Sequence, residues 1–140
     1  RYMEKPILSL IVGFLLLSTS LFAHSENPRE FEMKEGDTTY IMKQYVFCLY
    51  LSGTSRSQTE AEKQEIQVAH MNHINSMVET HNLQIAGPFG DDSEKRGILI
   101  FDLEKVEDAE AAMSQDPAVQ AGRLSYECHP WWAAKGSMLN

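Results

Sequence analysis

Cysteine is scarce in this sequence of 140 residues, which contains only Cys48 and Cys128. A single pair excludes a disulfide-rich scaffold. If the protein is exported to an oxidising compartment, the two cysteines are able to form a bridge. Both lie in apolar runs typical of strands, however, so two buried free thiols are an equally good interpretation.

The sequence also lacks an apolar run of the roughly 20 residues that a transmembrane helix requires. Its apolar run at residues 7–17 has eleven residues, follows a short basic start and leads into small residues up to Ala23. This arrangement is typical of a secretory signal peptide. Residues 1–23 are therefore predicted to be removed, with cleavage after Ser20 or retention as an anchor as the alternatives. A periplasmic or secreted protein without a stable membrane anchor is expected.

Basic residues are fewer than acidic ones. The sequence has 12 Lys and Arg and 20 Asp and Glu, which gives a net charge of −8. Nucleic acid phosphates and anionic membrane surfaces repel a protein of that charge. No nucleic acid partner is therefore expected. The apolar fraction of 43% and the charged fraction of 23% are those of an ordinary globular protein.

Motifs of common metal, nucleotide and hydrolase sites are absent. The sequence contains no HExxH or CxxC ligand pair, no GxGxxG or phosphate-loop lysine, and no nucleophile elbow. His70 and His73 lie one helical turn apart, but zinc sites usually need three or four protein ligands. No metal and no cofactor are therefore expected.

The order of strand and helix patterns predicts the fold class. Residues 24–42 are polar and weakly patterned, and are interpreted as a leader with at most a short strand near Tyr40. Residues 43–140 then follow the order strand, helix, strand, strand, helix, strand, which is the split pattern of ferredoxin-like α+β folds. A four-stranded antiparallel sheet is expected, with strands at 44–51, 83–86, 97–103 and 123–132 and helices at 59–80, 106–115 and, as a short segment, 116–122.

Two of these strands scarcely alternate between apolar and polar residues. A strand with one face in water should alternate, yet "YVFCLYL" (45–51) and "GILIFDL" (97–103) do not. Both faces of the sheet are therefore expected to be buried, while two helices can cover only one. The second face is predicted to meet another copy of the chain in a two-fold homodimer. Burial under the polar leader is the alternative.

Residues 43–139 resemble the YCII-related family of dimeric α+β barrels. The motifs that carry the resemblance are "AHMNHI" (69–74), "LQIAGPF" (83–89) and "DPAVQAGRLSYECHPWW" (116–132). The resemblance implies a dimeric α+β barrel and a His-Asp pair, whose positions here are His70 and Asp116. It also implies chemistry on small and in some cases aromatic molecules, because the family includes dehydrochlorinating enzymes.

The candidate site residues have structural interpretations as well. His70 borders the apolar stripe of its helix, where an imidazole either bonds to backbone or, oriented by a carboxylate, serves as a base. Asp116 precedes Pro117 and is a predicted N-cap, and its two oxygens allow both roles. His73 and His81 are expected to do no chemistry.

A pocket beside His70 is expected to be bounded by Pro88 and Phe89, which end the second predicted strand, and by His129 in the last. Two functions follow from these residues. One is an exported enzyme in which His70 moves a proton in an elimination or lyase reaction. The other is a non-catalytic module that binds a small ligand or a partner with the same fold.

Overall fold

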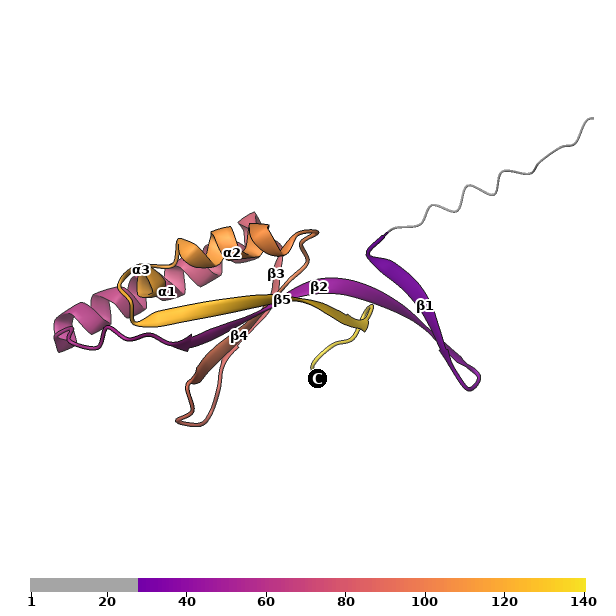
Figure 1. The fold of residues 1–140 in the computed structure, drawn as a ribbon, viewed down its shortest axis with the longest axis horizontal. Coiled ribbons are helices and arrows are strands. Elements are labelled where there is room, and N and C mark those ends of the chain that lie inside the picture. Colours follow the sequence, from indigo (N-terminus) through magenta and orange to yellow (C-terminus); the bar gives the residue numbers. More distant parts are fainter. Residues whose placement is uncertain (1–27) are drawn as a thin grey trace, which may run out of the picture.

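The structure is a computed structural model that describes residues 28–140. The predicted signal peptide lies outside the described residues. Three helices lie on one face of an antiparallel sheet of five strands, as Figure 1 shows. The elements are β1 (Glu30–Glu35), β2 (Thr38–Ser52), α1 (Glu60–Thr80), β3 (Leu83–Pro88), β4 (Lys95–Phe101), α2 (Val106–Ser114), α3 (Pro117–Gln120) and β5 (Leu124–Ala134).

The four predicted strands form the main sheet, in the order β5, β2, β4, β3, and every neighbouring pair is antiparallel. With the helices on one face, the α+β class is confirmed and the arrangement is consistent with a ferredoxin-like fold. None of the helices within residues 28–140 combines the length and the apolar character needed to cross a membrane.

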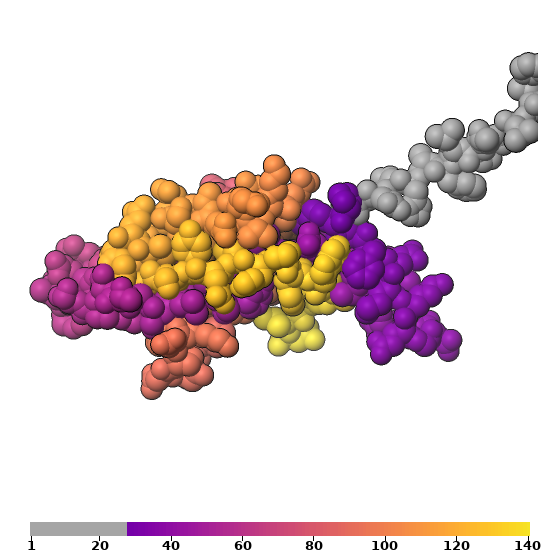
Figure 2. Space-filling view, viewed as in Figure 1, coloured from indigo at the N-terminus to yellow at the C-terminus, as the bar shows by residue number. Residues whose placement is uncertain are grey.

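A fifth strand corrects the interpretation of residues 28–42 as part of a polar leader. β1 pairs with the first residues of β2, from Glu30 opposite Lys43 to Glu35 opposite Thr38, and Gly36 adopts a positive φ of 60° in the turn. This hairpin arm, residues 30–43, extends beyond the helices (Figure 1), and Figure 2 shows it in indigo at the end of the molecule. The strand β1 was not recognised in the sequence because its polar side chains remain exposed. It is held by backbone pairing with β2 along one edge, so no apolar pattern is required of it.

The buried core lies between the helices and the inner face of the sheet. Alternate residues of β2, namely Val46, Cys48 and Tyr50, point inward and are at most 3% exposed. Phe101 of β4 and Met77 of α1 are fully buried against them. This alternation fixes which side chains of β2 face α1.

Helix α1 begins as predicted, because Thr59 and Glu62 form a reciprocal capping box. The apolar residues of this helix are not all buried, as they would be if its whole apolar face were packed against the sheet. Only Met77 is fully buried, whereas Met71 is 44% and Val78 54% exposed. The helix is therefore not packed onto the sheet along its whole length, and a cavity lies beneath its apolar side.

The outer face of the sheet is only partly buried in the single chain. Tyr45, Phe47 and Leu49 of β2 point outward and are partly exposed, and Trp131 of β5 is 40% exposed. The described part of the predicted leader does not lie across this face, because β1 pairs edge to edge with β2. The alternative in which the leader covers the sheet therefore fails for residues 28–42.

Cys48 and Cys128 form a disulfide bond, which resolves the two interpretations left open by the sequence. They lie directly opposite each other on β2 and β5, with a Cα–Cα distance of 4.1 Å. The bond joins positions 80 residues apart in the chain. It thus connects the first strand of the main sheet to the last.

Reduction of this bond should destabilise the protein. The bond closes a long loop and thereby lowers the conformational entropy of the unfolded chain, and reduction restores that entropy. We expect dithiothreitol to lower the free energy of unfolding by about 2–4 kcal/mol, measured by urea titration. The C48A/C128A double variant is the control, and its stability should not respond to the reductant. A wild-type protein that is equally stable with and without reductant would contradict the prediction.

Candidate active site

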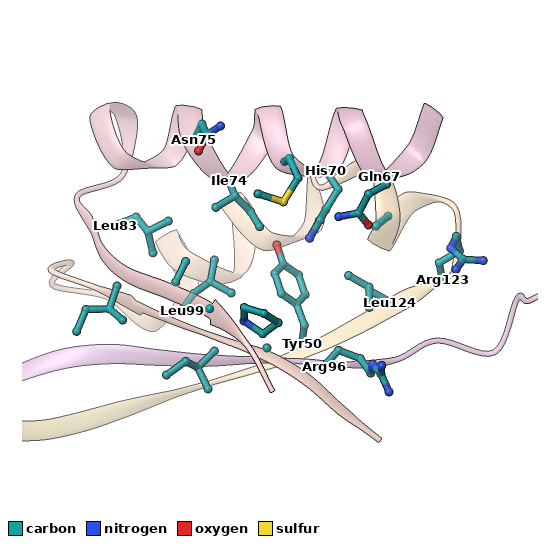
Figure 3. Close-up of a pocket in the computed structure, with 18 of the residues that line it drawn as sticks. Tyr50, Gln67, His70, Ile74, Asn75, Leu83, Arg96, Leu99, Arg123 and Leu124 are labelled. Atoms are coloured by element: carbon teal, nitrogen blue, oxygen red, sulfur yellow. The ribbon is translucent and has the colours of Figure 1, made fainter. Parts of the chain in front are cut away.

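A cavity of about 680 Å³ lies between α1 and the sheet. Figure 3 shows α1 above it and the strands below, with His70 and Tyr50 pointing toward each other in its interior. Most of its lining is apolar, with polar side chains at a few points. The lining includes Tyr50, His70, Ile74, Leu83, Leu99 and the arginines at positions 56, 96 and 123.

Three parts of the chain meet at the carboxylate of Asp116, which is completely buried. The Nδ1 atom of His70, on α1, lies 2.7 Å from Oδ2 of Asp116. The hydroxyl group of Tyr50, on β2, donates a hydrogen bond to the same oxygen. Oδ1 accepts a 2.8 Å hydrogen bond from the backbone N–H of Ala118, so Asp116 is also the N-cap of α3. The predicted cap and the contact with His70 coexist because each uses a different oxygen.

Local sequence explains how α3 presents this carboxylate. Pro117 occupies the first helical position, where its lack of an N–H group leaves no bond unmade, and Gly122 adopts a φ of 69° just past the helix end. The short helix is thus held at both ends, and Asp116 is directed toward α1 and β2.

The pKa of the Asp116 carboxyl group is held below its ordinary value. Burial by itself acts to raise this pKa, but the hydrogen bonds from His70, Tyr50 and Ala118 outweigh it. The group is therefore a carboxylate at neutral pH, and a carboxylate can only accept hydrogen bonds. Nδ1 of His70 must then carry a proton, so in the neutral ring Nε2 carries the lone pair.

Tyr50 serves this site as a phenol. Burial, followed by the hydrogen bond to Asp116 and its negative charge, raises the pKa of the Tyr50 hydroxyl far above its ordinary value. The group keeps its proton at any physiological pH and donates a hydrogen bond to the carboxylate. Its ring also packs edge-on against the ring of His70, with the centroids 5.3 Å apart. Tyr50 therefore contacts both members of the His70–Asp116 pair and holds the carboxylate in place as a neutral hydrogen-bond donor.

His70 connects this buried cluster to the cavity. Its side chain is 12% exposed and lines the cavity, and within residues 28–140 no group forms a hydrogen bond with Nε2. A small molecule bound in the cavity could thus be reached by the ring nitrogen that points away from Asp116.

The other predicted residues lie in different places. Pro88 lines the cavity, but Phe89 does not. His129 lies on the outer face of the sheet opposite Phe47, where its side chain is 58% exposed and 3.6 Å from Glu127. Of the three residues expected to bound the pocket, Pro88 therefore lines the cavity, and Phe89 and His129 do not.

His73 and His81 have structural contacts. Nε2 of His73 lies 2.9 Å from the carbonyl oxygen of Ala112 and connects α1 to α2. His81 forms the C-cap of α1 and contacts the hydroxyl group of Thr80. Within residues 28–140 no group of three or more His, Cys, Asp or Glu side chains is placed to hold a metal ion.

Sequence reasoning missed Tyr50 and the three arginines. The position of Tyr50 could have been inferred, because it shares the inner face of β2 with Val46 and Cys48. The arginines carry no such signal, since each lies in or beside a loop and only the fold brings them to one cavity.

Comparison with known proteins gives little further information. No protein-family model matches the chain, and no curated protein matches it. A solved structure similar to it is the 5-chloro-2-hydroxyhydroquinone dehydrochlorinase TftG from Burkholderia phenoliruptrix AC1100, in complex with 2,5-dihydroxybenzoquinone. The two chains are 19% identical with a TM-score of 0.45, and the match covers 61% of this chain and 92% of the other.

The lowered pKa of Asp116 predicts a loss of stability in acid. The unfolded chain has an Asp pKa of about 3.9, so it takes up a proton at higher pH than the folded protein. The stabilisation is complete above that pH and is lost as the pH falls through the folded-state pKa. We expect the free energy of unfolding to decrease less between pH 5 and pH 2 in D116N than in the wild type, in urea titrations at each pH.

The control is D92N, which removes a carboxyl group from the exposed loop between β3 and β4. It should retain the acid sensitivity of the wild type. If D116N and the wild type lose the same free energy over this range, the Asp116 carboxylate is not preferentially stabilised in the folded protein.

Proposed function

We propose that this protein is an exported, YCII-like enzyme in which His70 transfers a proton on a small organic molecule in an elimination or lyase reaction. The observation that supports the proposal is the 2.7 Å contact between His70 and the buried Asp116, at a ring that also lines a cavity. A base oriented by a carboxylate and open to a ligand is the arrangement that general base catalysis requires.

In the proposed mechanism, Nε2 of His70 removes a proton from an acidic C–H or O–H group of the bound molecule. The ring then becomes an imidazolium cation, which the negative charge of Asp116 stabilises through Nδ1. Tyr50 keeps the carboxylate in place during this change. The same nitrogen later returns the proton to the product or to the leaving group.

The lining favours proton transfer over covalent catalysis. Among the lining residues there is no serine, threonine, cysteine or lysine side chain to act as a nucleophile. Elimination and isomerisation need only a base and a conjugate acid, which His70 supplies in turn. Hydrolysis through a covalent intermediate would need groups that this cavity does not have.

The test is deuterium exchange from D2O into small ketones with acidic C–H bonds, followed by NMR, with 2-indanone and phenylpyruvate as probes. The variant H70N keeps a side-chain N–H group for Asp116 but removes the base. It should exchange at least about 100-fold more slowly than the wild type, as expected for loss of a general base. H81N is the matched control, because His81 lies at the exposed end of α1, and it should leave the rate unchanged.

Exchange at an undiminished rate in H70N would contradict the proposal. A wild-type protein that binds the probes but does not accelerate exchange would instead favour the non-catalytic binding module.

We also propose that the outer face of the sheet is covered by a second copy of the chain. Phe47, Leu49 and Ile98 lie in neighbouring positions of β2 and β4 on this face, and Trp131 packs against Phe47 at a ring distance of 5.9 Å. A partly exposed apolar sheet face can be matched to itself by a two-fold axis, which buries it without a different partner.

Light scattering coupled to gel filtration should give twice the mass of a single chain. F47E places a charge in the centre of this face and should reduce the mass to that of one chain, with the circular dichroism spectrum preserved. V68E adds the same charge to α1, where Val68 is 62% exposed, and should leave the mass unchanged. A wild-type protein with the mass of one chain would exclude the dimer.

A further inference from the structure

The cavity is positively charged although the protein is acidic. Its lining includes Arg56, Arg96 and Arg123 and contains no aspartate or glutamate. The chain as a whole has 20 acidic and 12 basic residues, so a cavity with three arginines and no lining acid departs strongly from the average surface. The carboxylate of Asp116 is close to this space, but it lies behind His70 and is fully buried.

None of these three guanidinium groups forms an ion pair within the part of the chain that the structure describes. Their side-chain contacts are with neutral oxygens. Arg96 donates to the carbonyl of Ser93 at 2.8 Å, and Arg123 to the side-chain oxygen of Gln58 at 3.0 Å. Arg56 donates to the hydroxyl of Ser52 at 3.1 Å. A guanidinium group has five N–H donors, so each of them retains donors for a ligand.

Two carboxylates that interact electrostatically with these arginines have hydrogen-bond partners of their own. Glu60 bonds to Lys63 at 2.5 Å and Asp91 to Ser93 at 2.8 Å. The hydrogen bonds to Lys63 and Ser93 are the main causes that lower the pKa values of Glu60 and Asp91, and the charges of Arg123 and Arg96 act in the same direction. Within residues 28–140, neither carboxylate therefore forms an ion pair with an arginine of the cavity.

The sheet register brings two of the arginines to one end of the cavity. Lys95 pairs with Leu51 and Leu124 pairs with Ser52, so Arg96 and Arg123 flank the end of β2. Figure 3 shows both on the same side of Tyr50 and His70, with Leu124 between them. Both are partly buried, whereas Arg56 is exposed. Partial burial strengthens a charge-assisted hydrogen bond, because less water competes for the donors.

The rest of the lining suits an apolar body. Ile74 of α1, Leu83 of β3 and Leu99 of β4 form the part of the cavity away from the arginines, as Figure 3 shows. His70 and Tyr50 lie between these apolar residues and the arginines. A molecule that filled both the apolar part and the arginine end of the cavity would therefore lie beside the Nε2 atom of His70.

We propose that the ligand of this cavity is a small carboxylate with an apolar body of the size of an aromatic ring, whose carboxylate is bound by Arg96 and Arg123. This inference names the substrate class for the proposed function, on which the role of His70 rests. Each guanidinium group can bind a carboxylate with paired, nearly parallel hydrogen bonds, and this geometry disfavours neutral molecules of the same shape. The arginines also offset the repulsion that a protein of net charge −8 exerts on an approaching anion.

The test compares phenylacetate with phenylacetamide, which have the same shape but differ in charge. Their binding to the purified protein is measured by isothermal titration calorimetry. We expect phenylacetate to bind at least about tenfold more tightly, as charge-assisted bonds require. In R96Q and R123Q this preference should fall to about threefold or less, while the affinity for phenylacetamide changes little.

The matched control is K105Q, which removes one positive charge from the beginning of α2, outside the cavity lining. It should keep the preference of the wild type. H70N should also keep it, because the proposed carboxylate site does not include His70. Selective binding of phenylacetate by H70N without deuterium exchange would therefore support the substrate class whatever the outcome for the reaction.

Three results would overturn the inference. The first is equal affinity of the wild type for phenylacetate and phenylacetamide. The second is the same preference in R96Q and R123Q as in the wild type. The third is the absence of binding by phenylacetate, benzoate and phenylpyruvate at millimolar concentration. In that case the arginines do not form a carboxylate site for ring-sized molecules.

Discussion

The organisation of this protein depends on the burial of one negative charge. Asp116 is fully removed from water, and a buried carboxylate is tolerated only if its oxygens are bonded. Its donors come from three separate elements, namely Tyr50 on β2, His70 on α1 and Ala118 on α3. Any displacement of these elements would leave the charge without a partner, so the carboxylate fixes their relative positions in a way that apolar contacts alone do not.

This constraint also explains the cavity. Helix α1 is held to α3 and the sheet by a polar contact at its middle, and by the buried Met77 further along. Between these points and the strands β3 and β4 its apolar residues Met71 and Val78 are not covered. A helix packed along its whole length would be more stable but would leave no space for a ligand. The charges of the site are also separated in space. The negative charge of Asp116 is buried behind His70, and the positive charges of the arginines lie on the cavity wall.

Individual elements show how far sequence patterns were sufficient. The start of the first helix at Thr59 and the short helix after Asp116 were predicted correctly, because helix caps depend on residues within a few positions of one another. The order of the main strands was also correct. The hairpin arm was missed because its strand pairing leaves the side chains exposed, so burial does not impose the alternation by which strands are recognised. His129 was placed near the pocket although the alternation of β5 directs it to the other face.

The sequence by itself determined the α+β class and the boundaries of the helices, and it led to the expectation, through a family resemblance, that His70 and Asp116 form a pair; their side chains lie 2.7 Å apart. These features follow from local periodicity, from capping preferences and from a family resemblance. Only the tertiary structure decided that Tyr50 completes the hydrogen bonds of the carboxylate, that Cys48 and Cys128 are bonded, and that arginines from two separate loops and from strand β4 line one cavity. The physical reason is that these contacts join positions from distant parts of the chain, and their distances are set by strand register and helix packing rather than by any short pattern of residues.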